Sequence, residues 1–370
     1  MKRILLCSPF YKDKENTTCG IANWTRNIMS RMTSVEGFQV ELMPYDRSVD
    51  LDEESRLWER LHSGFRDYLG VVFRTWKKIK ISKYDLIQVS TSASLGLFRD
   101  YLLVKIACWY NTRIIFHFHF GRMPEILNGK NWESWLMRRV LKNCSASIVM
   151  DPKSFDSLKE HGYNSVYYLP NPLSNKILDY IESNLSASYR VKRQLLFVGH
   201  VVKTKGVFEL VEACTQIENV SLRIVGKVFD DTKQSLLDIA QRRDGGTWLT
   251  FVGEISHKEV LREMSMCDMF VLPTYTEGFP NVILECMACG CPIIASDVGA
   301  IREMLNIDVK PCGVLIKPKS TDEVRNAIQS LIDDDKKKKE LGDLARIRIQ
   351  SQYNVEAIIL QLKDVWHKVL

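Results

Sequence analysis

The chain has 370 residues, of which 45% are apolar and 26% charged, and its net charge is +6. This length suffices for two domains with a core each, and this composition excludes a disordered chain. No run approaches the eighteen uncharged apolar residues of a membrane-spanning helix, and the apolar run in "MKRILLCSPF" is too short for a signal peptide. The chain has ten cysteines, which we expect to be free thiols in a cytoplasmic protein. Cys286 and Cys289 form a C-x-x-C, but no second pair of ligands stands at a suitable spacing, so we expect no bound metal.

Short apolar runs alternate with amphipathic, helix-length segments along the first half of the chain. Such alternation predicts parallel βαβ units. Ligands bind at the carboxyl ends of the strands in open parallel sheets, so the residues that follow each run are candidates for chemistry. The strands predicted for the first half are 3–8, 85–90, 113–120, 146–150 and 165–170.

A basic and aromatic segment, Arg56 to Lys83, interrupts this series. It holds eight Lys or Arg against two Asp or Glu, so its local charge of +6 equals the excess of the whole chain. Such a mixture can bind an anionic membrane surface, whereas no nucleic-acid motif accompanies it. A solvated helical face with snorkelling lysines is the simpler alternative. We expect contact with the inner face of the cell membrane, and no nucleic-acid partner.

A polar, helix-like stretch from Pro172 to Arg193 separates the first series of strands from a second one. Two successive series predict two doubly wound α/β domains, whose strand ends can form the walls of one cleft. The strands predicted for the second half are 194–200, 220–227, 249–254, 269–274 and 292–296.

The stretch "TYTEGFPNVILECMACGCPIIASDVG" (274–299) places Glu277 and Glu285 on either side of a strand-to-helix junction. Pro280 suits the first helical position, 281–289 has helical composition, and Gly290 suits the residue after the helix. The N–H groups at such a helix start favour phosphate. Carboxylates can accept hydrogen bonds from vicinal hydroxyls. The two glutamates are therefore expected to reach different parts of one polyhydroxylated, anionic ligand.

These residues resemble the E-x7-E signature of glycosyltransferase family four, which are retaining enzymes of the GT-B fold. The resemblance extends over nearly the whole chain, with "FVGHVVKTKGVFELVEA" (197–213) and a last helix, "YNVEAIILQLKDVW" (353–366), at matching places. It implies an N-terminal acceptor-binding domain that comprises residues 1–175 and a helix in 353–370 that returns to this domain. It also implies a nucleotide-sugar-binding domain at 190–352.

The donor-binding residues follow from the same resemblance. A lysine at 205, between a strand and a helix, can neutralise a diphosphate leaving group, and Lys203 is a second candidate. The family commonly has arginine where this chain has His200, which offers fewer donors. The expected donor site comprises Gly20, Gly199, His200, Lys203, Lys205, Gly226, Gly253, Glu277, Gly278, Phe279, Pro280, Asn281 and Glu285.

Two histidines in "IIFHFHFG" (114–121) lie on one face of a predicted strand. His119 is the better match to the family's active-site histidine near the sugar, and His117 is the second choice. The alternative is a pair of satisfied core histidines. In the loop 15–27, where the family often has two glycines near the donor phosphates, only Gly20 has the freedom for close backbone approach.

The expected reaction is transfer of a hexose-type sugar from a nucleotide-sugar to a saccharide or lipid-linked acceptor, as in bacterial surface-polysaccharide synthesis. Front-face substitution is the working mechanism, with His119, His117, Lys205 and Glu277 as catalytic candidates. No metal is needed if Lys205 and the helix start neutralise the diphosphate, and the nucleotide-sugar is a substrate, not a cofactor. The alternatives are a non-catalytic nucleotide-sugar-binding subunit and another GT-B enzyme, such as a nucleotide-sugar epimerase.

Overall fold

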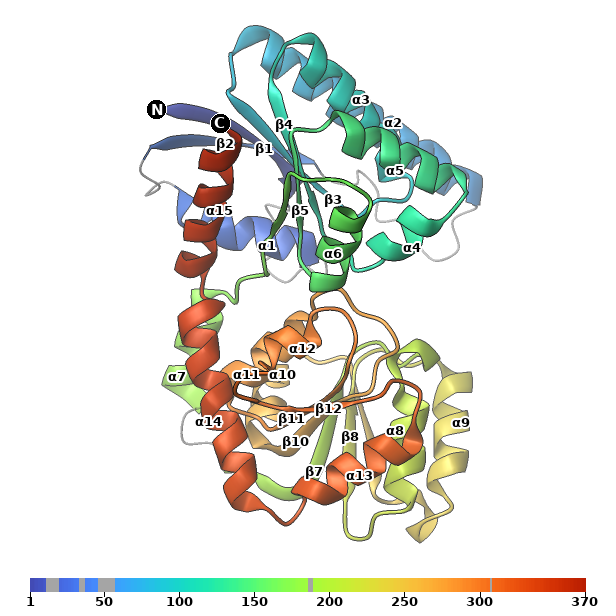
Figure 1. Cartoon of the computed structure of the whole chain (residues 1–370). Coiled ribbons are helices and arrows are strands. Elements are labelled where there is room, and N and C mark those ends of the chain that lie inside the picture. Colours follow the sequence, from blue (N-terminus) through green and yellow to red (C-terminus); the bar gives the residue numbers. More distant parts are fainter. Residues whose placement is uncertain (11–19, 33–36, 46–56, 186–188, 307) are drawn as a thin grey trace. The chain divides into compact units, whose positions relative to one another are not determined.

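The structure is a computed structural model that describes residues 1–10, 20–32, 37–45, 57–185, 189–306 and 308–370, with only the helical backbone of 57–66 (Figure 1). The chain forms two compact units. Unit 1 comprises Met1–Pro172 with Val355–Leu370, and unit 2 comprises Leu173–Asn354. The polar stretch after Pro172, left between the two predicted domains, contains a helix of unit 2, α7 (Asn175–Leu185).

Unit 1 contains a parallel six-stranded sheet with the strand order β2-β1-β3-β4-β5-β6. Five of its strands were predicted within a few residues, and β2 was not. The strands are β1 (Lys2–Pro9), β2 (Phe38–Tyr45), β3 (Leu86–Thr91), β4 (Arg113–Phe118), β5 (Ala146–Val149) and β6 (Val166–Tyr168).

Helices cover both faces of this sheet (Figure 1). Residues of β4 alternate between the two cores, with Phe116 on one face and Ile115 on the other, as the pleat of a strand requires. One face packs against α2 (Leu57–Ile81), α3 (Gly96–Trp109), α4 (Met123–Asn128), α5 (Trp132–Asn143) and α6 (Pro152–Glu160). The other packs against α1 (Gly20–Met29) and α15 (Val355–Val369).

Helix α15 is the last helix predicted from the sequence, and it completes the core of unit 1. Its buried Trp366 contacts the ring of Phe38 at 5.3 Å between centroids. The indole Nε1 of Trp366 donates to Oε1 of the buried Gln88 at 2.6 Å. A buried indole N–H needs a hydrogen-bond partner, so this bond determines the position of α15 on β3.

Unit 2 contains a second parallel six-stranded sheet, with the order β12-β11-β10-β7-β8-β9. The predicted fold class, two doubly wound α/β domains, is therefore confirmed. Chain order runs outward in both directions from the neighbouring strands β7 and β10, which makes this pair a topological switch point. The strands are β7 (Val191–Val198), β8 (Ser221–Val225), β9 (Leu249–Gly253), β10 (Cys267–Leu272), β11 (Ile293–Ser296) and β12 (Val314–Ile316).

The helices of unit 2 follow the strands as in other doubly wound sheets. Helix α14 is joined to the sheet by the buried Lys338, whose Nζ lies 2.8 and 2.9 Å from the two carboxylate oxygens of Asp268 at the start of β10. Besides α7, the helices are α8 (Val207–Thr215), α9 (Asp230–Ala240), α10 (His257–Met266), α11 (Asn281–Ala288), α12 (Ile301–Met304), α13 (Thr321–Leu331) and α14 (Asp335–Gln352).

Candidate functional site

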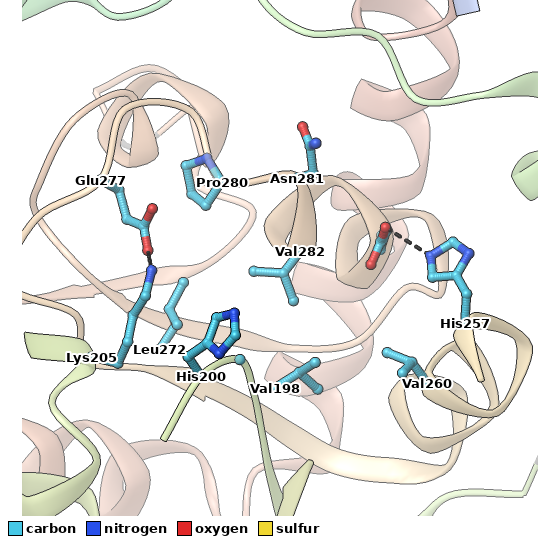
Figure 2. Close-up of a pocket in the computed structure, with 12 residues that line it drawn as sticks. Val198, His200, Lys205, His257, Val260, Leu272, Glu277, Pro280, Asn281 and Val282 are labelled. Carbon is cyan, nitrogen blue, oxygen red and sulfur yellow. Dashed lines mark hydrogen bonds and ion pairs between the residues drawn. The ribbon is translucent and has the colours of Figure 1, made fainter. Parts of the chain in front are cut away.

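A cavity of about 350 Å³ lies at the carboxyl ends of β7 and β10 in unit 2. This is the switch point of the sheet, where open α/β folds bind their ligands. Figure 2 shows the residues that surround it. They are Val198, Gly199, His200, Lys205, His257, Val260, Leu272, Glu277, Pro280, Asn281, Val282 and Glu285.

The loops that follow β7 and β10 are tied to each other beside this cavity. The carbonyl oxygen of Thr204 accepts the N–H of Tyr275 at 2.8 Å. Gly206 has a φ of 71°, and a Cβ there would lie 1.9 Å from the carbonyl oxygen of Pro273. Only glycine allows both this backbone conformation and this approach. The short turn that carries Lys205 is thereby held against the loop that carries Glu277.

Lys205 and Glu277 form an ion pair within this arrangement (Figure 2). Lys205 Nζ donates to Glu277 Oε1, and the two side chains are 29% and 15% exposed. Partial burial strengthens such a pair relative to one at the open surface. The glutamate therefore holds a charged ammonium at the edge of the cavity, where an anionic ligand can compete for it.

Helix α11 directs its N-terminus and Glu285 toward the same cavity. Pro280 was predicted to be the first residue of the helix, but it is the residue immediately before it. Its backbone is extended, with ψ at 111°, so it does not join the helix. Pro280 makes no side-chain cap bond to this helix, and backbone N–H groups at a helix start suit an anion. Gly290 follows the helix with a φ of 62°, which agrees with its predicted place. Glu285 lies within the helix, beyond the first turn.

His257 is a site residue that the sequence analysis missed. Its Nε2 lies 2.9 Å from Glu285 Oε1, and it is the first residue of α10. The hydrogen bond to Glu285 raises the pKa of His257, against a smaller lowering by burial. The signal was available, because "SHKE" (256–259) forms a capping box that starts the helix just after a strand.

Three predicted donor-site glycines lie together where β7, β8 and β9 end. The N–H of Gly199 donates to Val225, and the N–H of Gly226 donates to Gly253 at 2.8 Å. A Cβ on Gly226 would lie 2.1 Å from the carbonyl oxygen of Gly199. Only Gly199 of the three lines the cavity. Close backbone packing therefore accounts for the glycine at 226 without a ligand.

The remaining donor-site predictions in unit 2 differ in their placement. His200 lines the cavity and is exposed, whereas Lys203 is exposed and outside the lining. Phe279 is buried, with its ring 5.9 Å from that of Tyr353. The carbonyl oxygen of Gly278 accepts the N–H of Ala300, which anchors the loop before α11.

His117 and His119 are in unit 1, at the end of β4 and just beyond it. Their ring centroids are 3.9 Å apart, and both rings meet Trp24 edge-on. Burial lowers the pKa of His117 far below its usual value and that of His119 to about 3, so both rings are neutral at pH 7. Among the described residues, neither nitrogen of His117 nor Nε2 of His119 has a hydrogen-bond partner.

Gly20 begins helix α1 and is exposed. Residues 15–19 of the predicted loop 15–27 lie outside the described residues. The cysteines that the structure describes are free, and the C-x-x-C pair Cys286 and Cys289 is buried in α11 and at its end. In the described part of the chain, no group of three or more His, Cys, Asp or Glu is arranged to hold a metal ion.

Two relatives of this chain are described as glycosyltransferases of bacterial polysaccharide synthesis. It is 31% identical over 163 residues to the putative teichuronic acid biosynthesis glycosyltransferase TuaC of Bacillus subtilis, covering 44% of this chain and 39% of that protein. It is 24% identical over 310 residues to the capsular polysaccharide biosynthesis glycosyltransferase CapM of Staphylococcus aureus, covering 80% and 72%. The chain thus spans less than half the length of the first relative.

Among solved structures, Anabaena HepE in complex with UDP has the same fold, with a TM-score of 0.72, 17% identity and full coverage of both chains. Two family models match successive parts of this chain. Residues 18–174 match the model Glycosyltransferase Family 4, and residues 183–348 match Glycosyl transferases group 1. Together these matches take in most of both units, and the chain belongs to the group 1 glycosyltransferases of the family-four type.

Proposed function

We propose that this glycosyltransferase moves a hexose from a nucleoside-diphosphate sugar to a saccharide or lipid-linked acceptor, with retention of the anomeric configuration and without a metal. The observation that carries the proposal is the cavity at the β7–β10 switch point, where Lys205, Glu277, Glu285 and the start of α11 converge. A cation, two carboxylates and a helix N-terminus suit a ligand that is both anionic and polyhydroxylated.

The diphosphate of the donor would be bound by Lys205 and by the start of α11. The ammonium of Lys205 is already held at the cavity edge by Glu277, so little side-chain entropy is lost when phosphate binds. His200, exposed on the lining, can donate a further hydrogen bond. These groups would also stabilise the charge that develops on the leaving diphosphate.

The two glutamates would hold hydroxyl groups of the same donor. Glu285 uses Oε1 for His257, which leaves Oε2 to accept from a ribose hydroxyl. Glu277, beside the lysine that meets the phosphates, would accept from the hexose. The two carboxylates lie on the two sides of one helix start, which supports contact of one with the ribose and of the other with the hexose.

Transfer would proceed by front-face substitution. The bond between the anomeric carbon and the diphosphate oxygen breaks, and the acceptor oxygen bonds to the anomeric carbon on the same face. The acceptor proton passes to the departing diphosphate oxygen. The enzyme's part is to position both substrates and to stabilise the leaving group. The roles of His119 and His117 near the sugar stay predictions from the family resemblance.

The relatives guide the choice of donor and process. Structures of HepE have been solved with UDP and with UDP-glucose. TuaC and CapM are described as glycosyltransferases of polysaccharide synthesis. We propose UDP-hexose as the first donor to test and bacterial surface-polysaccharide synthesis as the process. Action in the cytoplasm, at the inner face of the cell membrane, stays a prediction.

Nucleotide binding tests the site. Melting temperatures are measured with UDP, GDP, ADP and CMP, each with its common sugar conjugates, in the presence of EDTA. A ligand at a hundredfold excess over its Kd stabilises the protein by about 2.7 kcal/mol. One nucleotide family is expected to raise the melting temperature. Lys205→Ala should weaken binding of the diphosphate far more than binding of the nucleoside. Absence of a shift with every compound would contradict the proposal.

Product analysis tests the reaction. Incubation of the donor with saccharide or lipid-linked acceptors should give a product whose anomeric configuration, read from NMR coupling constants, matches that of the donor. Inversion would exclude front-face retention. Tight binding without transfer to any acceptor would favour a non-catalytic subunit, and conversion of the free nucleotide-sugar to an isomer would identify an epimerase.

A further inference from the structure

Helix α3 of unit 1 has apolar side chains on two opposite sides. Its inner side contributes Leu103, Val104 and Ala107 to the core. Its outer side presents Phe98, Leu102 and Trp109 to solvent, and Trp109 is 87% exposed. With Lys105, these outer residues recur at intervals of four, three and four, which places them on one stripe of the helix. A helix of an ordinary globular surface would be polar there.

Helix α5 repeats this pattern. Trp132 and Trp135 are exposed, the latter by 54%, and Arg139 and Lys142 continue the same stripe at intervals of four and three. The guanidinium of Arg139 lies 5.1 Å from the ring centroid of Trp135. Aromatic and basic side chains thus share one stripe of the helix, as they do on α3.

The two stripes lie side by side. At the start of both helices, the rings of Phe98 and Trp132 stack with centroids 5.5 Å apart and an angle of 15°. At the far ends, Cys108 Sγ lies 3.9 Å from the carbonyl oxygen of Asn143. The helices therefore run parallel to each other, as Figure 1 shows. We call the resulting surface the aromatic face, and it consists of Phe98, Leu102, Trp109, Trp132 and Trp135.

Basic groups surround the aromatic face without exposed carboxylates on the same helices. The acidic residue of α3, Asp100, is buried against Arg99, and that of α5, Glu133, pairs with Arg122. The exposed charges of α3 and α5 are Lys105, Arg138, Arg139 and Lys142. The neighbouring helix α2 adds exposed Phe73, Arg74, Lys77, Lys80 and Ile81.

We propose that the aromatic face docks on the surface of an anionic lipid bilayer. Tryptophan rings favour the depth of the lipid headgroups, and lysine and arginine reach the anionic phosphates while their stems stay in the apolar boundary. Single exposed apolar residues are ordinary, but two adjoining stripes rimmed by cations are not. The helices would lie on the membrane, and no helix in the described part of the chain has the length and apolarity to cross one. The proposal extends the predicted contact from α2 to α3 and α5.

Vesicle co-sedimentation tests the docking. The full chain is mixed with phosphatidylcholine vesicles with or without phosphatidylglycerol, at low and high salt. We expect retention by the anionic vesicles that weakens as salt screens the charges. Trp109→Ser/Trp135→Ser and, separately, Lys105→Glu/Lys142→Glu should each weaken retention by about tenfold. Val309→Ser/Ile347→Ser and Lys310→Glu/Lys336→Glu are matched controls, since all four residues are exposed in unit 2, and these variants should be retained like the unmodified chain.

Two further measurements separate the outcomes. Nucleotide-induced thermal stabilisation should be equal in all variants, which shows that they fold and keeps the docking test independent of the donor proposal. Sedimentation velocity gives the oligomeric state. Failure of the unmodified chain to bind anionic vesicles, or equal retention of the aromatic-face variants, would overturn the proposal. Dissociation of an oligomer by Trp109→Ser/Trp135→Ser, without vesicle binding, would make the face an interface between copies.

Discussion

The pocket of unit 2 and the histidine pair of unit 1 use similar side chains in opposite ways. In the pocket, His257 and Lys205 each have a carboxylate partner, and the pKa of His257 is raised. In unit 1, the rings of His117 and His119 lie against each other and against Trp24, and burial keeps both neutral. The charged partner of His257 outweighs its partial burial, whereas desolvation is the largest cause of the lowered pKa values in the histidine pair, and the neighbouring His119 lowers the pKa of His117 further. The two regions thus differ in charge: the pocket holds cationic side chains beside carboxylates, whereas the histidine pair is neutral at pH 7.

The largest effect is expected at the lysine of the pocket. Lys205→Ala should lower turnover by about 100- to 1,000-fold, since in the proposed function it removes the cation that stabilises the leaving diphosphate. Lys203→Ala is the matched control, because Lys203 is on the same turn but outside the cavity lining. Steady-state kinetics with a UDP-hexose measure both variants. An equal loss of turnover in both variants would contradict the specific role proposed for Lys205.

The second effect concerns the carboxylate that His257 holds. Glu285→Ala should raise the Kd for the nucleotide by about 10- to 100-fold, because a hydrogen bond to a charged group contributes roughly 1.5–3 kcal/mol. Calorimetric titration measures it. Removal of His257 alone, in His257→Ala, should have a smaller effect, since the carboxylate remains. A larger loss in His257→Ala than in Glu285→Ala would show that the histidine contacts the ligand itself.

A smaller effect is expected in the histidine pair. His117→Leu should leave the free energy of unfolding within about 1 kcal/mol of the original value, or raise it, because two buried ring nitrogens without described partners are removed. Phe118→Leu, also buried on β4, is the control and should lose about 1 to 2 kcal/mol. Chemical denaturation measures both. A loss of several kcal/mol in His117→Leu would mean that the ring is hydrogen-bonded.

The smallest effect is a difference in titration between the two regions. NMR of the imidazole protons should place the pKa of His257 above 6.5 and leave His119 neutral down to about pH 3. Because folding raises the pKa of His257, its contribution to stability is full below about pH 6.5 and disappears as the pH rises through the raised value. Glu285→Gln should return the pKa of His257 toward 6.5. An unchanged pKa in that variant would assign the shift to another group.

Much of the fold followed from the sequence because strand-like runs and helix-length segments alternate so regularly. The two strands that were missed, β2 and β12, are both at sheet edges. Strand β2 contains Glu41 and Pro44, which an edge tolerates because one side of the strand has no neighbour to bond. Strand β12 has three residues, too few for an alternation to be recognised.

The candidate site was predictable only in part. Glu277, Glu285 and Lys205 stand near recognisable strand ends, and all three line the cavity. Their partners could not be predicted, because the Lys205–Glu277 pair joins residues 72 positions apart and the His257–Glu285 pair joins residues 28 apart. Such pairings depend on the order of strands in the sheet and on the close packing at Gly206, neither of which is encoded in a local pattern.

The seating of α15 has a consequence for synthesis of the chain. Gln88 and Trp366, which bond to each other in the core of unit 1, are 278 positions apart. While the ribosome translates unit 2, the face of the first sheet that α15 will cover stays open to water. Unit 2, whose residues are contiguous, can fold before the unit that precedes it is complete. Unit 1 is therefore begun first on the ribosome, but its core cannot be completed until the last residues of this chain have been made.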